Sequence, residues 1–172
     1  MLYVSRFSNP ELKSGKYTPV RISLGAPKWP LGYTIAGEIK DLMPFGLLQI
    51  NDRALYEKKY RERLDRIGVD RIQAALDSFG VDKTVVLLCY EDVRDPSQWC
   101  HRTIFAQWWL ENTGEIADEL TDPSNVRLKN PQPAQTAKAA AHAPAPSHSA
   151  AAKQMKERMK AREADEMQMR MF

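Results

Sequence analysis

The sequence of 172 residues contains only two cysteines, Cys89 and Cys100, and no long run of apolar residues. Two cysteines cannot cross-link a domain of this size, so we favour free thiols over a disulfide. No segment approaches the roughly 20 apolar residues that a membrane-spanning helix needs. The N-terminus also lacks the basic, apolar and small-residue series of a secretory signal. We therefore expect a cytoplasmic protein without a membrane span.

Several common catalytic motifs are also missing. The sequence has no glycine-rich phosphate loop, no G-x-S-x-G elbow and no H-E-x-x-H helix, so three large enzyme classes lose their usual support. A zinc ion would have Cys89, Cys100 and His101 as ligands, with Glu91 as a fourth. The paired C-x-x-C spacing of zinc sites is absent, however. We therefore expect neither a metal ion nor a cofactor.

Charge is distributed unevenly along the chain, whose formal net charge is +3. Residues 1–125 hold 16 Lys and Arg against 18 Asp and Glu, whereas residues 126–172 hold 9 against 4. The basic character therefore belongs to the C-terminal part. Charge does not favour a general attraction of residues 1–125 to nucleic acid.

Composition divides the chain into three parts. Residues 1–125 contain most of the large apolar side chains and can form one domain with a core. Residues 126–152 are rich in Pro and Ala, which predicts a disordered, flexible linker. Residues 153–172 are charged and Met-rich and favour a C-terminal helix. A helix of this length is marginal in water, so a fraying helix and a helix ordered by a partner protein both fit the pattern.

Strand and helix signals alternate along residues 1–125. Short runs of β-forming residues bounded by turn residues predict strands at 2–7, 18–24 and 84–89, and an edge strand or helical turn at 115–120. Apolar residues at helical spacing predict a short helix within 35–43 and longer helices at 56–67 and 69–79. Asp95, Pro96 and Gln98 have the pattern of an N-cap, a first-turn proline and a capping-box glutamine, so a further helix is predicted from residue 96 to about 112.

The run at 84–89 is almost continuously apolar, which is typical of a strand buried on both faces of a sheet. Helices then have to cover the sheet. We therefore predict an α/β fold of three layers, with a mostly parallel sheet and helices on both faces.

Reactive side chains follow the predicted strands. Cys89 and Glu91 stand at the end of the most apolar strand, and the consecutive residues Cys100, His101 and Arg102 stand near the start of the next helix. Ligands of such folds meet the carboxyl ends of the strands. Three further cationic residues fall near predicted strand ends, namely Arg6, Arg21 and Lys28.

The residue types at these positions favour an anionic ligand. Arginine presents a fork that matches phosphate or carboxylate oxygens, and helix N-termini bind the same anions. A phosphate-like, nucleotide-like or nucleic-acid ligand is therefore predicted, bound by Arg6, Arg21, Lys28, Cys89 and Arg102.

A thiol beside an imidazole and a cation also loses its proton easily and becomes a nucleophile. Cys100 is the candidate nucleophile, with His101 or Glu91 as proton carrier. Adjacent helical residues point about 100° apart, so Cys100 and His101 need not touch. Contact of His101 with Glu91 or Cys89 is equally open.

Ordinary structural roles compete with these assignments. Cys89 follows four apolar residues, and such a cysteine usually behaves as a small buried hydrophobe. Cys100 could pack on the helix face of Ile104. Arg21 and Arg102 could pair with acidic residues, which is the commoner role of an arginine.

The run Leu87-Leu88-Cys89-Tyr90-Glu91 and the later Trp99-Cys100-His101-Arg102 resemble the domain of unknown function 488 family, which shows a C-x-E and then a C-H-R motif. The stretch at 21–30 and the tyrosine-bearing helix around Tyr56 and Tyr60 add to the resemblance, which covers about residues 1–120. The resemblance implies a compact α/β domain and a site at Cys89, Glu91, Cys100, His101 and Arg102, with Arg21, but no settled reaction. The insert at 92–99 is longer than the family pattern has.

Two functions of different kinds fit these observations. The first is an α/β protein with a strand-end pocket for an anionic small molecule or nucleic acid, in which Cys100, His101 and Glu91 carry out catalysis. The alternative is a non-enzymatic adaptor whose C-terminal helix binds a partner protein or an anionic surface.

Overall fold

The computed structural model describes residues 1–126 of the chain. The linker predicted at 126–152, apart from Val126, and the helix predicted at 153–172 lie outside the described residues. Within residues 1–126, no helix has the length and apolar character needed to cross a membrane.

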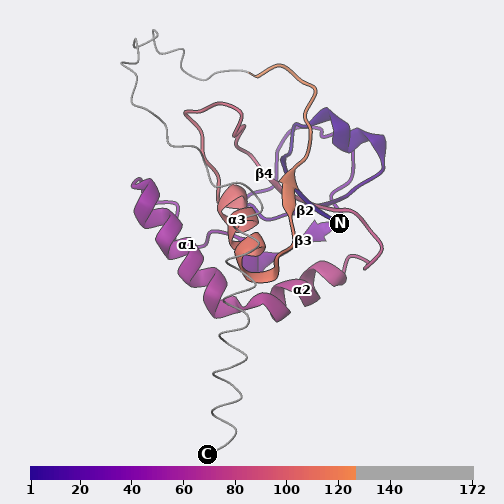
Figure 1. The fold of residues 1–172 in the computed structure, drawn as a ribbon. Helices are drawn as coiled ribbons and strands as arrows, with labels where there is room; N and C mark the ends of the chain where they lie inside the picture. Colours follow the sequence, from indigo (N-terminus) through magenta and orange to yellow (C-terminus); the bar gives the residue numbers. More distant parts are fainter. Residues whose placement is uncertain (127–172) are drawn as a thin grey trace, which may run out of the picture. The chain divides into compact units, whose positions relative to one another are not determined.

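Five parallel strands form one sheet, in the order β3-β2-β4-β1-β5 (Figure 1). The strands are β1 (Leu2–Arg6), β2 (Thr18–Arg21), β3 (Gly37–Glu38), β4 (Val85–Cys89) and β5 (Ala117–Glu119). The central strand β4 is buried at every position, as its continuous apolar run predicts. Of the two alternatives predicted for 115–120, the edge strand forms, as β5. β3 was not predicted, because a strand of two residues has no recognisable sequence pattern.

The register of the central strands brings their carboxyl ends to one edge of the sheet. Arg6 in β1 stands beside Cys89, and Arg21 in β2 stands beside Leu88. Side chains alternate between the two faces of a strand. Cys89 therefore points to the same face of β4 as Val85 and Leu87, which is the face that the α-helices cover.

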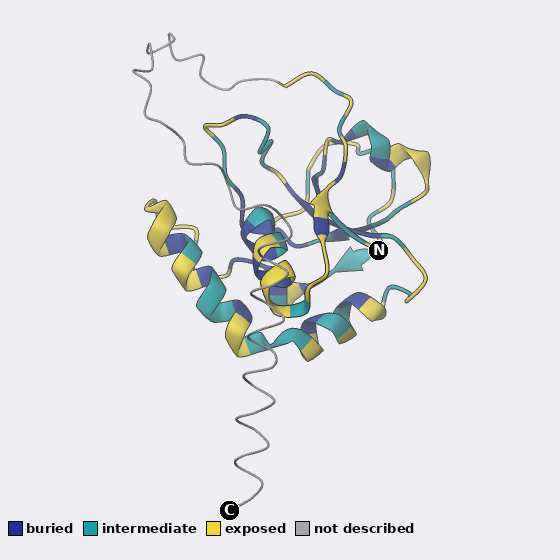
Figure 2. Ribbon diagram, viewed as in Figure 1, coloured by how far each residue is buried: buried dark blue, intermediate teal, exposed yellow. Residues whose placement is uncertain are grey.

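Three α-helices and two short 3-10 helices complete the described fold. They are η1 (Pro10–Ser14), η2 (Lys40–Leu42), α1 (Arg53–Ile67), α2 (Val69–Asp77) and α3 (His101–Thr113). The helix predicted within 35–43 is the 3-10 helix η2, preceded by β3. Figure 2 shows buried residues recurring along α1 and α3 between exposed ones.

The two faces of the sheet are covered unequally. Val85 and Leu87 pack into a core with side chains of all three α-helices, among them Tyr60 and Trp109. Val86 and Leu88 point to the other face, where they pack with Leu12 of η1 and side chains of neighbouring loops. The predicted α/β fold with a parallel sheet is confirmed, and α-helices cover the first face, whereas helices were predicted on both faces. On the second face the covering consists of a 3-10 helix and loops.

Local sequence signals explain the long helix pair. The Asp52 side chain accepts a hydrogen bond from the backbone N–H of Leu55 at 2.6 Å and so caps α1. Tyr56, Tyr60 and Leu64 recur at a spacing of four and form the buried stripe of that helix. Gly68 adopts a φ of 81°, a conformation that glycine reaches easily, and so turns the chain directly from α1 into α2.

The predicted helix start at Pro96 is wrong. α3 begins at His101, and Cys100 is its N-cap residue in an extended conformation. The Asp95 carboxylate instead accepts hydrogen bonds from the Ser97 backbone and hydroxyl, at 2.9 and 2.8 Å. An Asp side chain that bonds two residues on closes a local turn as readily as it caps a helix. The later start places both Cys100 and His101 at the N-terminal end of α3.

Candidate functional site

Four of the predicted site residues meet in one cavity at the carboxyl edge of the sheet. Cys89, Glu91, Cys100 and His101 line it, and its volume is about 460 Å³. The remaining walls come from the loops after β2 and η2, from α1 and from the loop before α3: Ser23, Leu24, Gly25, Pro44, Leu48, Ile50, Asn51, Tyr56, Tyr90 and Trp99. A cavity of this size accommodates a small molecule.

His101 is held from two sides. Its Nε2 lies 3.0 Å from the carbonyl oxygen of Ile22, at the end of β2, and the ring of Tyr60 meets its ring edge to face at 5.4 Å. A carbonyl oxygen only accepts hydrogen bonds, so Nε2 carries the proton and donates it. The other ring nitrogen, Nδ1, is therefore free to act as an acceptor or base.

Nδ1 of His101 faces both thiols. It lies 3.7 Å from Sγ of Cys100 and 3.8 Å from Sγ of Cys89. Cys100 and His101 are therefore in contact, a possibility that the sequence did not decide. The contact is possible because Cys100 precedes the helix in an extended conformation, so the two side chains are not 100° apart as adjacent helical residues are. The contact with Cys89 exists as well. The same imidazole nitrogen therefore lies near the sulfur atoms of both free cysteines.

The two thiols differ in their tendency to ionise. Burial opposes ionisation of Cys100, but hydrogen bonds from Cys89 and His101 and the nearby charges of His101 and Arg102 lower its pKa well below that of an ordinary thiol. The hydrogen bond to Cys100, followed by burial and the charges of Cys100 and Glu91, raises the pKa of Cys89. The cluster thus favours a thiolate at Cys100 beside a protonated thiol at Cys89.

Glu91 contributes a buried carboxyl group that holds its proton more tightly than an ordinary glutamate side chain does. Burial, followed by the negative charge of Cys100, raises the pKa of this side chain. Its Oε2 atom is buried and has no hydrogen-bond partner among the described residues. A buried polar atom without a partner costs free energy, so a bound ligand could satisfy it.

The same atoms are suitable donors for a soft metal ion. Sγ of Cys89, Sγ of Cys100 and Nδ1 of His101 all lie within 4.8 Å of one another. Thiolate and imidazole ligands are those that zinc prefers. A fourth ligand would have to come from outside this trio.

The predicted arginine ligands are engaged elsewhere. Arg21 pairs with Glu38 and donates to the carbonyl oxygens of Ser23 and Leu24, both at 3.0 Å. Arg6 forms ion pairs of 2.9 and 2.7 Å with Asp92 and Asp122, and it lines a separate hollow with Ser8, Ser124 and Asn125. Neither side chain lines the cysteine cavity.

Arg102 and Lys28 also lie outside the cavity lining. Arg102 is fully buried, and its Nε and Nη2 donate to the two carboxylate oxygens of Glu119 in β5 at 3.0 and 2.9 Å. Arg102 therefore joins α3 to the edge strand β5 through an ion pair, which is the commoner role of an arginine. Lys28 is exposed.

Sequence reasoning missed several groups that shape the site. The backbone carbonyl of Ile22 orients His101, and no side-chain motif could have revealed it. Tyr56 and Trp99 line the cavity with their rings 4.7 Å apart. The spacing of Tyr56 and Tyr60 indicated a helix stripe, and only the fold turns one ring toward the cavity and the other toward His101.

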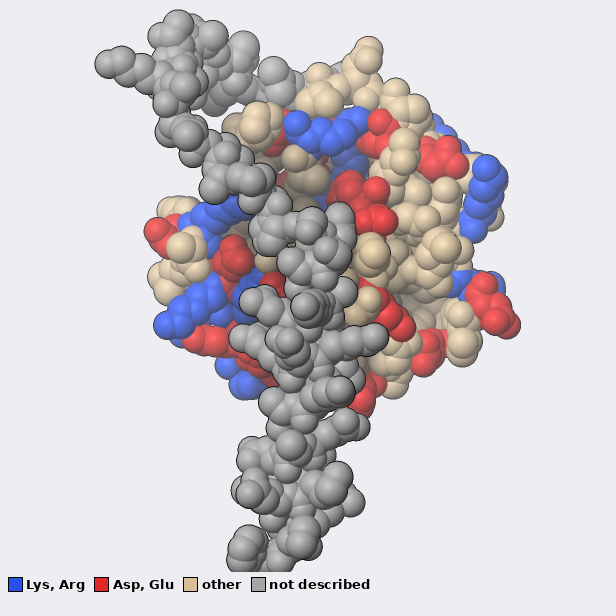
Figure 3. Space-filling view, in the orientation of Figure 1, with Lys and Arg blue, Asp and Glu red and all other residues tan. Residues whose placement is uncertain are grey.

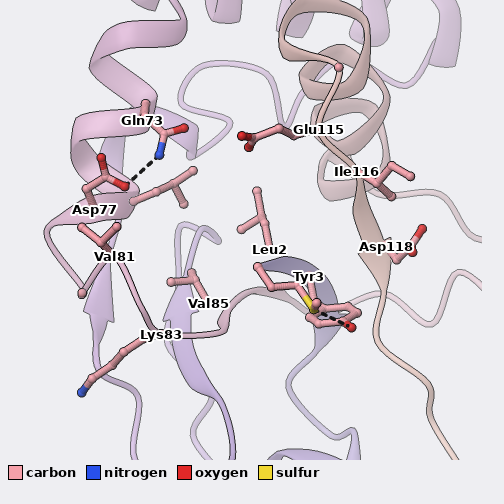
Figure 4. A pocket seen from close by; sticks show the side chains of 14 residues that line it. Leu2, Tyr3, Gln73, Asp77, Val81, Lys83, Val85, Glu115, Ile116 and Asp118 are labelled. Atoms are coloured by element: carbon pink, nitrogen blue, oxygen red, sulfur yellow. Dashed lines mark hydrogen bonds between the residues drawn. The ribbon is translucent and has the colours of Figure 1, made fainter. Parts of the chain in front are cut away.

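A second, larger hollow of about 730 Å³ lies at the amino edge of the sheet (Figure 4). Figure 4 shows Glu115 directed toward the space above Leu2, and Gln73 and Asp77 on the opposite wall. The Gln73 amide donates a hydrogen bond of 2.8 Å to the Asp77 carboxylate. Neither cysteine nor histidine lines this hollow. Ligands of parallel α/β sheets meet the carboxyl edge, so the smaller cysteine cavity is the better candidate.

Surface charge is mixed on the face shown in Figure 3, where basic and acidic side chains of the described residues lie close together. Arg61 pairs with Glu57 and Glu111, and Arg71 pairs with Asp41. Such pairing leaves little unbalanced positive charge at these arginines, and nucleic-acid binding depends on such charge.

Comparison of the chain with protein-family models, curated proteins and solved structures found no match in any of the three. The resemblance to the domain of unknown function 488 family therefore stays a prediction.

Proposed function

We propose that the cavity binds a small anionic molecule with an electrophilic centre, and that Cys100 attacks this centre as a nucleophile. One observation carries the proposal. Nδ1 of His101 lies 3.7 Å from Sγ of Cys100 in the cavity wall, while the Ile22 carbonyl engages the opposite ring nitrogen. This is the arrangement that a base needs to accept the proton of a nucleophile.

Each member of the predicted catalytic trio then has a role. His101 takes the thiol proton, which leaves Cys100 as a thiolate. The thiolate is the reactive form of cysteine. Glu91, whose Oε2 atom has no hydrogen-bond partner among the described residues, can in its protonated form donate a hydrogen bond to the oxygen or leaving group on which negative charge develops.

The positive end of α3 supports an anionic ligand. The first backbone N–H groups of a helix have no partner within it, and together with the helix dipole they favour anions. Cys100, the N-cap of this 13-residue helix, lines the cavity. Because Arg6, Arg21 and Arg102 are paired with carboxylates, the anion preference is assigned to this helix end.

Cavity size and lining favour a small molecule over a nucleic-acid strand. The volume of about 460 Å³ limits the ligand, and Leu48, Ile50 and Trp99 offer apolar contacts for its body. Two unbridged thiols also agree with a reducing compartment, so we propose a cytoplasmic location.

We also propose that the chain is a divergent member of the domain of unknown function 488 family. The support is that both halves of its motif contribute to one cavity, Cys89 and Glu91 from the first half and Cys100 and His101 from the second. The longer insert at 92–99 joins the two halves of the motif in sequence, and residues of both halves still line the same cavity.

A pair of alkylating reagents tests the proposal. Iodoacetamide and iodoacetate react alike with thiolates, but only iodoacetate is an anion. We expect Cys100 to react with iodoacetamide at neutral pH far faster than a free thiol peptide. The ratio of iodoacetate to iodoacetamide rates should exceed that of the peptide by about fivefold, which corresponds to about 1 kcal/mol from a helix N-terminus. Peptide mass mapping locates the label.

Two variants assign the reaction. Cys89→Ser retains Cys100 as the sole cysteine, so its label reports on Cys100 alone, and Cys100→Ser should lose the fast reaction. Alkylation of Cys100 no faster than that of the peptide would refute the nucleophile. Fast alkylation with the rate ratio of the free peptide would refute the anion preference and leave the nucleophile standing.

A further inference from the structure

Cys89 is the reactive side chain that the proposed function leaves unused. It is buried at the end of β4 and lines the same cavity as Cys100. Its Sγ lies 3.8 Å from Nδ1 of His101 and within 4.8 Å of the Cys100 sulfur. A thiol that served only to fill the core would not need to share the acceptor nitrogen of a proposed catalytic base.

The two sulfurs come from segments that meet only in the folded chain. Cys89 ends the central strand, Cys100 precedes α3, and residues 90–99 form the loop between them. A disulfide needs a sulfur separation of about 2.05 Å, so the sulfurs must approach one another. Because Cys100 lies outside the first turn of α3, its side chain can turn toward Cys89 without unwinding the helix.

The two sulfurs occupy unlike positions in the fold. Cys100 is the N-cap residue of α3, where the backbone N–H groups and the helix dipole favour a thiolate, whereas Cys89 is the last residue of the buried strand β4. Dithiol reductants use such asymmetry, because one thiolate attacks the substrate first and the second thiol attacks afterwards. The asymmetry indicates the order in which the two cysteines would react.

We infer that Cys100 and Cys89 form a two-electron reducing pair that reduces small hydroperoxides bearing an anionic group in the cavity and ends as an intramolecular disulfide. The inference rests on the proposed function, because Cys100 is its nucleophile and the anionic electrophile is narrowed to such hydroperoxides. It adds Cys89 as the resolving thiol.

The first step oxidises Cys100. Its thiolate attacks the terminal peroxide oxygen, so that an S–O bond forms and the O–O bond breaks. The departing alkoxide, or hydroxide from hydrogen peroxide, takes up the proton that Cys100 gave to His101. The products are a sulfenic acid at Cys100 and an alcohol or water.

The second step forms the disulfide. Cys89 gives its proton to Nδ1 of His101, and its sulfur attacks the sulfur of the Cys100 sulfenic acid. An S–S bond forms, the S–O bond breaks, and the departing hydroxide takes the proton from His101 to become water. The two thiols have then lost two electrons and two protons to the peroxide, and an external thiol can restore them by exchange.

Oxidation of the full chain tests the inference. The reduced protein, kept in chelator so that no metal masks the thiols, is treated with an equimolar amount of hydrogen peroxide and then mapped by mass spectrometry without reductant. We expect the wild-type protein to become two hydrogens lighter and to yield one peptide pair linked through Cys89 and Cys100. In Cys89→Ser, dimedone should trap the sulfenic acid at Cys100.

The contrary results are equally clear. Wild-type protein that accumulates dimedone-labelled Cys100 without the internal disulfide would overturn the inference, as would a disulfide that joins two chains. Cys89→Ala provides a second variant if the serine hydroxyl disturbs the buried site. Fast alkylation of Cys100 without disulfide formation would refute this inference alone, whereas slow alkylation would refute the proposed function as well.

Discussion

His101 connects three elements at the scale of single residues. Its backbone begins α3, its Nε2 donates to the carbonyl that follows β2, and its ring packs against Tyr60 of α1. These contacts leave Nδ1 directed at the two sulfurs. The reactivity of Cys100 should therefore depend on this ring more than on any charged neighbour.

The pH dependence of alkylation tests the role of His101. Its hydrogen bond and charge lower the pKa of the Cys100 thiol, so the wild-type rate should reach half its maximum well below the ordinary thiol value of about 8.5. In His101→Gln the midpoint should move upward toward that ordinary value, at which only about 3% of a thiol is ionised at pH 7, so the rate at pH 7 should fall by at least about tenfold.

Recovery at high pH distinguishes a lost base from a damaged fold. At a pH above both midpoints the variant and wild-type rates should converge, since the Cys100 thiol is then ionised in both proteins. A variant that remains slow at high pH would contradict the assigned role. Lys58→Gln, which changes an exposed side chain of α1 outside the cavity, is the control and should keep the wild-type profile.

At the scale of elements, the ion pair of Arg102 with Glu119 joins the start of α3 to the edge strand β5. The guanidinium is fully buried and binds both carboxylate oxygens, while the carboxylate side chain remains 33% exposed. Breaking such a pair from one side leaves a charge without its partner, which destabilises a protein more than removing both charges does.

We expect Arg102→Met to lower the free energy of unfolding by about 2 kcal/mol, a value below the usual range for fully buried pairs because Glu119 is partly exposed. The double variant Arg102→Met, Glu119→Gln should recover part of this loss. Urea unfolding of both single variants and the double variant measures the coupling. Additive losses would show that the pair does not act as a unit.

At the scale of the whole molecule, the described residues 1–126 form a five-stranded sheet and three α-helices and include the four reactive side chains of the cavity. A chain cut after residue 126 should therefore unfold in one cooperative transition and keep the alkylation rate of Cys100. Loss of that rate with an intact fold would mean that residues 127–172 contribute to the site. The adaptor alternative instead predicts that truncation abolishes binding to a partner protein.

Much of the fold could be predicted from the chain because its signals are local. A continuous apolar run identified β4, tyrosines at a spacing of four identified α1, and glycines marked where helices end. The start of α3 could not be predicted in this way. Asp95 has the same local chemistry in a turn as in a cap, and only the rest of the fold decides which one forms.

For the candidate site, the sequence by itself determined which chemical groups are present and that Cys89, Glu91, Cys100 and His101 follow a buried strand. Tertiary structure decided which of them meet. It gathered these four around one cavity and paired Arg6, Arg21 and Arg102 with carboxylates instead. The physical reason is that the choice of partner depends on distances between side chains across the sheet. Strand register and helix packing set these distances, and the spacing of residues along the chain does not specify them.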